Sequence, residues 1–156
     1  MIPFNPDFKD LLSCLLAADV HFLLVGGYAL AFHGHPRATK DMDVWVEPTR
    51  ENAERILRAL ASFGAPTQDV TADDFTDLRT VFQIGVPPRR VGLVCSIEGV
   101  AFDQAWGDRE SLHLDDIEVP VIGLEAMLAN KQATGRAQDI ADAEVIRDLL
   151  KKSTKA

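Results

Sequence analysis

The chain has 156 residues, about the length of one average domain, and 47% of them are hydrophobic and 26% charged. This composition is that of an ordinary globular protein and excludes a disordered or collagen-like chain, so we expect one domain spanning residues 1–156. A formal charge of -8 disfavours a protein that binds nucleic acid through many phosphate contacts. The longest apolar stretch near the start, residues 11–20, is too short to span a bilayer, so we expect a cytoplasmic protein without a membrane segment.

Hydrophobic periodicity and turn residues divide the chain into helices and strands. Asn5 before Pro6 is typical of a helix start, and Gly26-Gly27 ends an apolar run and begins a helical one, which predicts a strand, a tight turn and a helix. The expected helices cover residues 6–19, 28–32, 50–63, 101–109, 124–134 and 138–152, with one or two helical turns within 71–78. The expected strands cover residues 21–25, 43–46, 81–84, 91–97 and 117–122.

The order of these elements predicts the fold class. The strands at 81–84 and 91–97 are joined by a short turn, so we expect an antiparallel hairpin. Pro120 predicts that the strand at 117–122 lies at a sheet edge, because proline cannot donate to a central ladder. Helices scattered between strands, with at least one hairpin, predict an α+β fold in which a mixed β-sheet is flanked by helices.

Asp41 and Asp43 are the sharpest chemical feature of the sequence. Side chains two positions apart on a strand point to the same face, with Cα atoms about 6.5 to 7 Å apart, so these two carboxylates converge. A hard cation such as Mg²⁺ accepts one or two carboxylates and takes its other ligands from water and substrate phosphates. The pair is consistent with a site for Mg²⁺ or Mn²⁺, and equally with two exposed acids at the entrance of a strand.

Gly26 and Gly27 make the metal-site interpretation more specific. A helix N-terminus offers unpaired amides and the positive end of a dipole to an anion, and glycine allows a phosphate to approach the backbone. Alone, the pair indicates only a tight turn. A strand, a glycine pair and a helix, followed by Asp41-x-Asp43 on a second strand, is far more specific for phosphate and metal than either half.

These residues resemble the small bacterial nucleotidyltransferases of the DNA polymerase beta superfamily, near the minimal and AbiEii toxin-like groups. The resemblance runs from LVGG at 24–27 and RATKDMD at 37–43 to KQATGRAQDIAD at 131–142, and covers about residues 20–150. It implies metal-dependent transfer of a nucleoside monophosphate from an NTP to an acceptor hydroxyl. It also implies a partner protein, as acceptor or as the other member of a toxin-antitoxin pair.

The resemblance also implies roles for individual residues. In the helix at 124–134 the apolar stripe would next fall on Lys131, which places an ammonium on the inward face, where the family has a triphosphate-binding lysine. Asp139 follows in an R-x-x-D run and is expected to orient Lys131 or Arg136 rather than to bind metal. The other implied roles are metal ligation and catalysis by Asp41 and Asp43, and phosphate binding by Gly26, Gly27 and Arg37.

Gly92 departs from the family pattern. The wider superfamily takes a third carboxylate from a neighbouring strand, where close relatives read Arg-Ile-Asp and this chain reads Arg90-Val91-Gly92. Two carboxylates are expected to keep the metal ion at the triphosphate and to lose the ion that activates the acceptor, which weakens catalysis. The alternative is a non-catalytic nucleotide-binding or protein-interaction module of the same fold.

Overall fold

The computed structural model describes residues 5–36, 41–86 and 89–154. Within these ranges, no helix is both long enough and apolar enough to cross a membrane. The elements in chain order are α1 (Pro6–Ala17), β1 (Phe22–Val25), α2 (Gly26–Phe32), β2 (Met42–Val46), α3 (Arg50–Phe63), the 3-10 turn η1 (Asp74–Thr76), β3 (Val81–Ile84), β4 (Val91–Val94), α4 (Phe102–Gly107), β5 (Glu110–Leu114), β6 (Ile117–Val121), α5 (Leu124–Thr134) and α6 (Ala137–Thr154).

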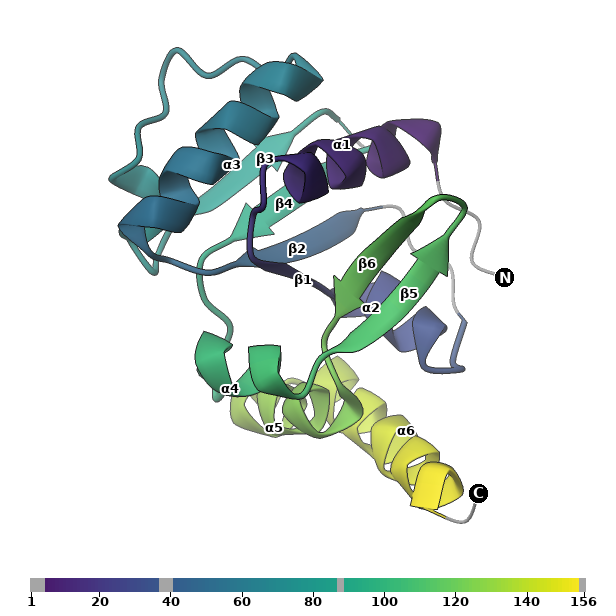
Figure 1. Ribbon diagram of the computed structural model, residues 1–156. Coiled ribbons are helices and arrows are strands. Elements are labelled where there is room, and N and C mark those ends of the chain that lie inside the picture. Colours follow the sequence, from purple (N-terminus) through teal and green to yellow (C-terminus); the bar gives the residue numbers. More distant parts are fainter. Residues whose placement is uncertain (1–4, 37–40, 87–88, 155–156) are drawn as a thin grey trace.

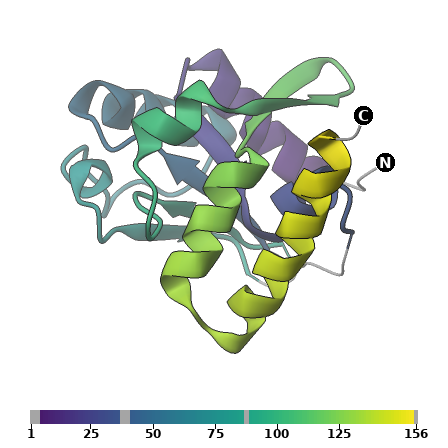
Figure 2. The same cartoon turned by 90° about the horizontal axis from the view of Figure 1, so that it is seen from below.

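The strands form one mixed sheet in the order β3-β4-β2-β1-β6-β5 (Figure 1). Strand β2 lies at its centre, antiparallel to β1 and parallel to β4, and β3 pairs with β4 as the predicted antiparallel hairpin. Helices α1 and α3 cover one face of the sheet, and α5 and α6 lie on the opposite side, where Figure 2 shows them in front of the strands. The predicted α+β fold with a mixed sheet flanked by helices is therefore confirmed.

Local sequence signals account for most of the element boundaries. The Asn5 side chain accepts a hydrogen bond from the Asp7 N–H and caps α1, and Thr49 caps α3 in the same way through the Asn52 N–H. Gly64 ends α3 in the left-handed conformation, with φ of 91°, which a side chain would disfavour. Figure 1 shows α1 and α3 side by side over the sheet, and their inward faces supply much of the core.

Two predictions about the C-terminal hairpin are wrong. Strand β6 is not an edge strand, because it lies between β1 and β5. Its pairing with β1 is restricted to Leu24 and Val121, with the Ile122 N–H donating to Leu24 O, so Pro120 precedes the segment that pairs with β1. Residues 110–114, for which the pattern predicts no strand, form β5 by pairing with β6, although three of the five residues are exposed.

The side chain of Asn52 joins the start of α3 to the neighbouring ends of β1 and β2. It is completely buried, accepts a hydrogen bond from the His21 N–H at 2.7 Å, and donates to His21 O and Glu47 O at 3.0 and 2.9 Å. One amide thus bonds three backbone groups. The His21 carbonyl also accepts from the Glu47 N–H and the Glu47 carbonyl from the Thr49 N–H, so Asn52 adds a second donor to each. It fixes the outer end of the central strand pair relative to α3.

We expect Asn52→Ala to destabilise the fold by about 2 to 3 kcal/mol, because it removes three hydrogen bonds of a completely buried side chain and deprives the His21 N–H of its acceptor. Urea unfolding followed by circular dichroism measures the change. Glu54→Ala, at an exposed position of the same helix, is the matched control and should change stability by less than about 0.5 kcal/mol. Equal effects of the two substitutions would contradict this role of Asn52.

Candidate active site

The carboxylate of Asp43 lies between two glycines, Gly26 at the start of α2 directly after β1, and Gly92 within β4. Asp43 pairs with Val25 on β1 and with Gly92 on β4. Its Oδ2 lies 2.9 Å from the position that a Cβ on Gly26 would occupy, and its Oδ1 lies 3.2 Å from the corresponding position on Gly92. The carboxylate therefore fits against the backbone on both sides because both neighbours lack a side chain.

Gly26 begins α2 immediately after the last residue of β1. Its φ of 70° is in the left-handed region, which turns the chain from strand into helix without an intervening loop. Gly27 follows as the second residue of the helix. The structure thus places the predicted glycine turn directly beside Asp43, as the strand-turn-helix pattern requires.

Asp41 forms an ion pair with Arg90, a contact that the sequence pattern does not predict. Arg90 donates to Asp41 Oδ2 through Nη2 at 2.8 Å and through Nε at 3.3 Å, and both side chains are 34% exposed. The cause is the parallel register of β2 and β4, in which Met42 lies opposite Val91 and the Met42 N–H donates to Arg90 O. The available signal was the equal spacing of Asp41-x-Asp43 and Arg90-x-Gly92 on paired strands.

Lys131 reaches the same place from α5. A pocket of about 270 Å³ brings it together with Gly26 and Asp43. The remaining lining side chains are mostly apolar and come from β1, α2, the end of β4 with the residues after it, and α5. The pocket therefore has a carboxylate, a glycine turn and an ammonium group in a lining that is otherwise mostly apolar, with Ser96 and Asn130 as further polar side chains, and could hold a small anionic ligand together with a cation.

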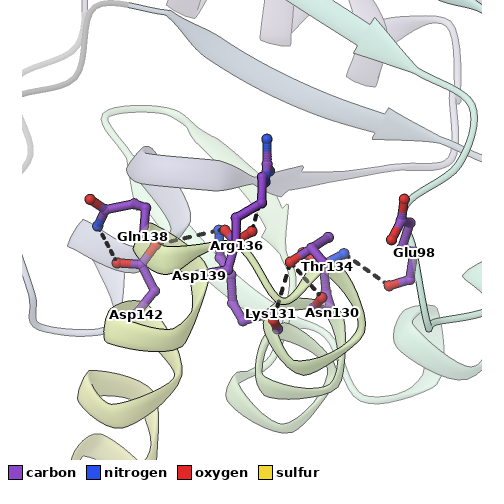
Figure 3. Close-up of polar contacts among 8 residues, drawn as sticks. All are labelled: Glu98, Asn130, Lys131, Thr134, Arg136, Gln138, Asp139 and Asp142. Atoms are coloured by element: carbon purple, nitrogen blue, oxygen red, sulfur yellow. Dashed lines mark hydrogen bonds and ion pairs between the residues drawn. The ribbon is translucent and has the colours of Figure 1, made fainter.

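Two buried carboxylates hold Lys131 in position (Figure 3). Its Nζ lies 3.4 Å from Asp139 Oδ1 and 3.4 Å from Asp142 Oδ2, and these two side chains are only 4% and 3% exposed. Asp139 also accepts a hydrogen bond from Arg136 Nε at 2.8 Å. The prediction that Asp139 pairs with Lys131 or Arg136 is confirmed, since it contacts both. Asp142 was missed, although it follows Asp139 by three residues on the same face of α6.

The surroundings shift the pKa values of these carboxyl groups in opposite directions. Burial raises the pKa of Asp43, the charge of Asp41 raises it further, and the positive charges of Arg90 and Lys131 partly offset the rise. A hydrogen bond from the Thr134 hydroxyl, followed by one from Arg136, lowers the pKa of Asp139 to about 2. Asp43 is thus a carboxylate whose ionised form a further cation would stabilise, whereas Asp139 is already neutralised by its neighbours.

Glu98, Asp74 and Asp77 are other acids that could replace the missing third carboxylate, but among the described residues none of them forms a metal-binding group with Asp41 and Asp43. Glu98 is exposed, and its backbone carbonyl accepts a hydrogen bond from Asn130. Asp74 and Asp77 are bonded to Thr71 and Arg79 respectively. Across residues 5–36, 41–86 and 89–154, no group of three or more His, Cys, Asp or Glu side chains is placed to hold a metal ion.

The donor set fits one hard divalent cation better than two. Asp41 and Asp43 offer carboxylate oxygens, and the glycine turn at Gly26 leaves room beside Asp43 that a Cβ would fill. Mg²⁺ commonly binds proteins through one or two carboxylates and completes its shell with water and substrate phosphates. Arg37, the other expected phosphate contact, lies outside the described residues.

Comparison with known proteins identifies the family. Residues 10–149 match the family described as "Nucleotidyl transferase AbiEii toxin, Type IV TA system". The chain belongs to the AbiEii nucleotidyltransferase toxin family. The resemblance noted from the motifs is therefore confirmed, and the AbiEii match covers both strands that carry Asp43 and Gly92 as well as the helix that carries Lys131.

Solved structures with the same fold include two nucleotidyltransferases. The lincosamide antibiotic adenylyltransferase LnuA, in its lincomycin-bound form, has a TM-score of 0.59 and 13% identity over 94% of this chain and 98% of LnuA. TM1012 from Thermotoga maritima, a proposed nucleotidyltransferase, has a TM-score of 0.55 and 16% identity over 93% of this chain and 91% of TM1012. Comparison with curated proteins gave no match.

We expect Gly26→Ala to destabilise the chain by about 1 to 2 kcal/mol, because alanine disfavours the left-handed conformation and its Cβ would displace the Asp43 carboxylate. Thermal and urea unfolding measure this loss. Gly107→Ala is the control, since a Cβ there meets no atom within 4 Å, and we expect a change below about 0.5 kcal/mol. A Gly26→Ala variant as stable as the control would refute the close packing of Asp43 on this turn.

The low pKa of Asp139 predicts a pH-dependent contribution to stability. Because the folded-state pKa of about 2 lies below the ordinary value of 3.8, ionised Asp139 stabilises the fold above about pH 4, and this contribution disappears as the pH falls toward 2. We expect Asp139→Asn to destabilise the protein by roughly 1 to 2 kcal/mol at pH 6, with the difference from wild type shrinking between pH 4 and 2. Urea unfolding at each pH tests this, and a difference independent of pH would contradict it.

Proposed function

We propose that this AbiEii family member transfers a nucleoside monophosphate from an NTP to an acceptor hydroxyl, using one divalent cation, Mg²⁺ or Mn²⁺. The observation that carries the proposal is the convergence of Gly26, Asp43 and Lys131 on one pocket. Family membership supplies the reaction class, and the pocket supplies groups suited to a metal-bound triphosphate.

Each group has a distinct role in this proposal. Asp41 and Asp43 hold the metal ion, which when bound would offset the negative charge of the triphosphate and of the reacting phosphoryl group. The turn at Gly26 and Gly27 lets phosphate oxygens approach the backbone, and Arg37 adds a further phosphate contact. Lys131 provides a positive charge whose direction is set by Asp139 and Asp142.

The reaction itself is an in-line displacement. The acceptor oxygen forms a bond to the α-phosphorus while the bond from that phosphorus to the bridging oxygen of the β-phosphate breaks, and pyrophosphate leaves. The protein contributes mainly by positioning and by opposing charge, because phosphoryl transfer requires little covalent chemistry from side chains. The proposed partners are therefore an NTP and an antitoxin protein, in keeping with the toxin family, while the charge of -8 disfavours a nucleic-acid acceptor.

Gly92 favours one alternative, a nucleotide-binding module without catalysis. It lies directly opposite Asp43 in the ladder between β2 and β4, and the family resemblance implies an acid at this position. Without that acid, a second metal ion and the activation of the acceptor hydroxyl both lose a carboxylate. The alternative and the main proposal share the same nucleotide site and differ only in turnover.

Incubation with α-labelled NTP and Mg²⁺ or Mn²⁺, in the presence of cell extract as the source of acceptor, should label an acceptor. Asp41→Ala and Asp43→Ala should each reduce labelling at least about a hundredfold, because each removes a metal ligand. Asp103→Ala, an exposed acid on α4, is the matched control and should label like wild type.

Calorimetry with the same nucleotides separates the alternatives. Metal-dependent NTP binding without labelling would favour the non-catalytic module. Labelling that survives both aspartate substitutions would exclude the proposed site, and no binding of any NTP would contradict both functions.

A further inference from the structure

Arg90 places a permanent positive charge inside the proposed metal site. Two of its nitrogens, Nη2 and Nε, converge on the same oxygen of Asp41 at 2.8 and 3.3 Å. Its charge also acts on Asp43, where it opposes the rise in the pKa of that carboxyl group. One guanidinium group thus interacts electrostatically with both proposed metal ligands.

The backbone fixes this placement more firmly than an ordinary surface ion pair. Arg90 immediately precedes β4, and its carbonyl accepts a hydrogen bond from the Met42 N–H at 3.0 Å. Since Met42 lies between Asp41 and Asp43, the parallel register of β2 and β4 holds Arg90 next to the acid pair. The side chain is about two-thirds shielded from solvent, which limits the screening of its charge.

Among the described residues, few ligands remain for a second divalent ion on this side of the site. In two-metal sites the cations lie about 3.5 to 4 Å apart, and the ion remote from the triphosphate depends largely on protein carboxylates. Here Asp41 Oδ2 already accepts two hydrogen bonds from Arg90, and the position opposite Asp43 is Gly92. A dication brought to this place would also be repelled by the guanidinium charge.

We propose that the Arg90 guanidinium is the built-in second cation of the Asp41 and Asp43 site, so that the chain binds a single divalent ion. Arg90 accordingly acts through Asp41, because it occupies Asp41 Oδ2 and adds a positive charge, and so sets the number and affinity of metal ions. This inference rests on the proposed function, because it assumes that these two aspartates hold the metal.

Titration of the full chain with Mn²⁺, monitored by the electron paramagnetic resonance signal of the free ion, tests the proposal directly. We expect wild type to bind one Mn²⁺, with or without a non-hydrolysable NTP analogue. We expect Arg90→Gln to bind Mn²⁺ roughly tenfold more tightly in the absence of nucleotide, because a neighbouring positive charge is removed and Asp41 Oδ2 is released. Arg90→Lys keeps the charge and should stay within about threefold of wild type.

Arg89→Gln is the matched control, since Arg89 is the exposed neighbour whose guanidinium lies 3.8 Å from Asp7. It should bind Mn²⁺ like wild type. If Arg90 only held Asp41 in place, Arg90→Gln would bind Mn²⁺ more weakly than wild type, because the Asp41 ligand would become disordered. Circular dichroism of each variant confirms folding, and the wild-type stoichiometry tests the proposal even if Arg90→Gln does not fold.

The possible outcomes distinguish failure of the proposed role of Arg90 from failure of the proposed nucleotidyltransferase function. Two Mn²⁺ ions per wild-type chain, or unchanged or weaker binding by Arg90→Gln, would overturn the role of Arg90 and leave the nucleotidyltransferase proposal standing. No Mn²⁺ binding by wild type, even with the NTP analogue, would overturn the metal site itself and with it both proposals.

Discussion

The position of the Asp43 carboxylate depends on a steric constraint, namely that the backbone on both sides of it carries no Cβ. Its two oxygens lie where side chains on Gly26 and Gly92 would begin. Because β2 is sandwiched between β1 and β4, both glycines are brought to Asp43 by strand pairing rather than by flexible loops. Gly26 leaves room for the Asp43 carboxylate and also turns the chain from β1 into α2. The space beside the carboxylate and the proposed phosphate-binding turn therefore depend on the same residue.

Charge is distributed around this carboxylate from two separate parts of the fold. Arg90 immediately precedes β4 and pairs with Asp41, whereas Lys131 lies on α5 and pairs with two buried acids of α6. The two cations therefore differ in character. The Lys131 charge is balanced by two buried carboxylates that are not proposed metal ligands, while the Arg90 charge is balanced by a proposed metal ligand and, in our proposal, competes with the metal.

Family membership and local geometry answer different questions about this protein. The AbiEii match establishes the family to which the chain belongs, and the likeness to LnuA and TM1012 establishes the fold. Neither determines how many cations the site holds, because that depends on individual side chains. On the side of β4, Gly92 adds no charge beside Asp43, whereas Arg90 adds a positive charge beside Asp41.

Local sequence patterns predict the capped helices, the Gly26-Gly27 turn, and the pair Asp41 and Asp43 at the start of a strand. These depend on backbone dihedral preferences and periodicity within a few residues, which a single chain displays directly. Three other features follow from the three-dimensional packing of the chain. Strand β6 lies inside the sheet, Arg90 pairs with Asp41, and Asp142 contacts Lys131 together with Asp139. The physical reason is that strand order and register bring together residues tens of positions apart, and no spacing within either segment specifies its partner.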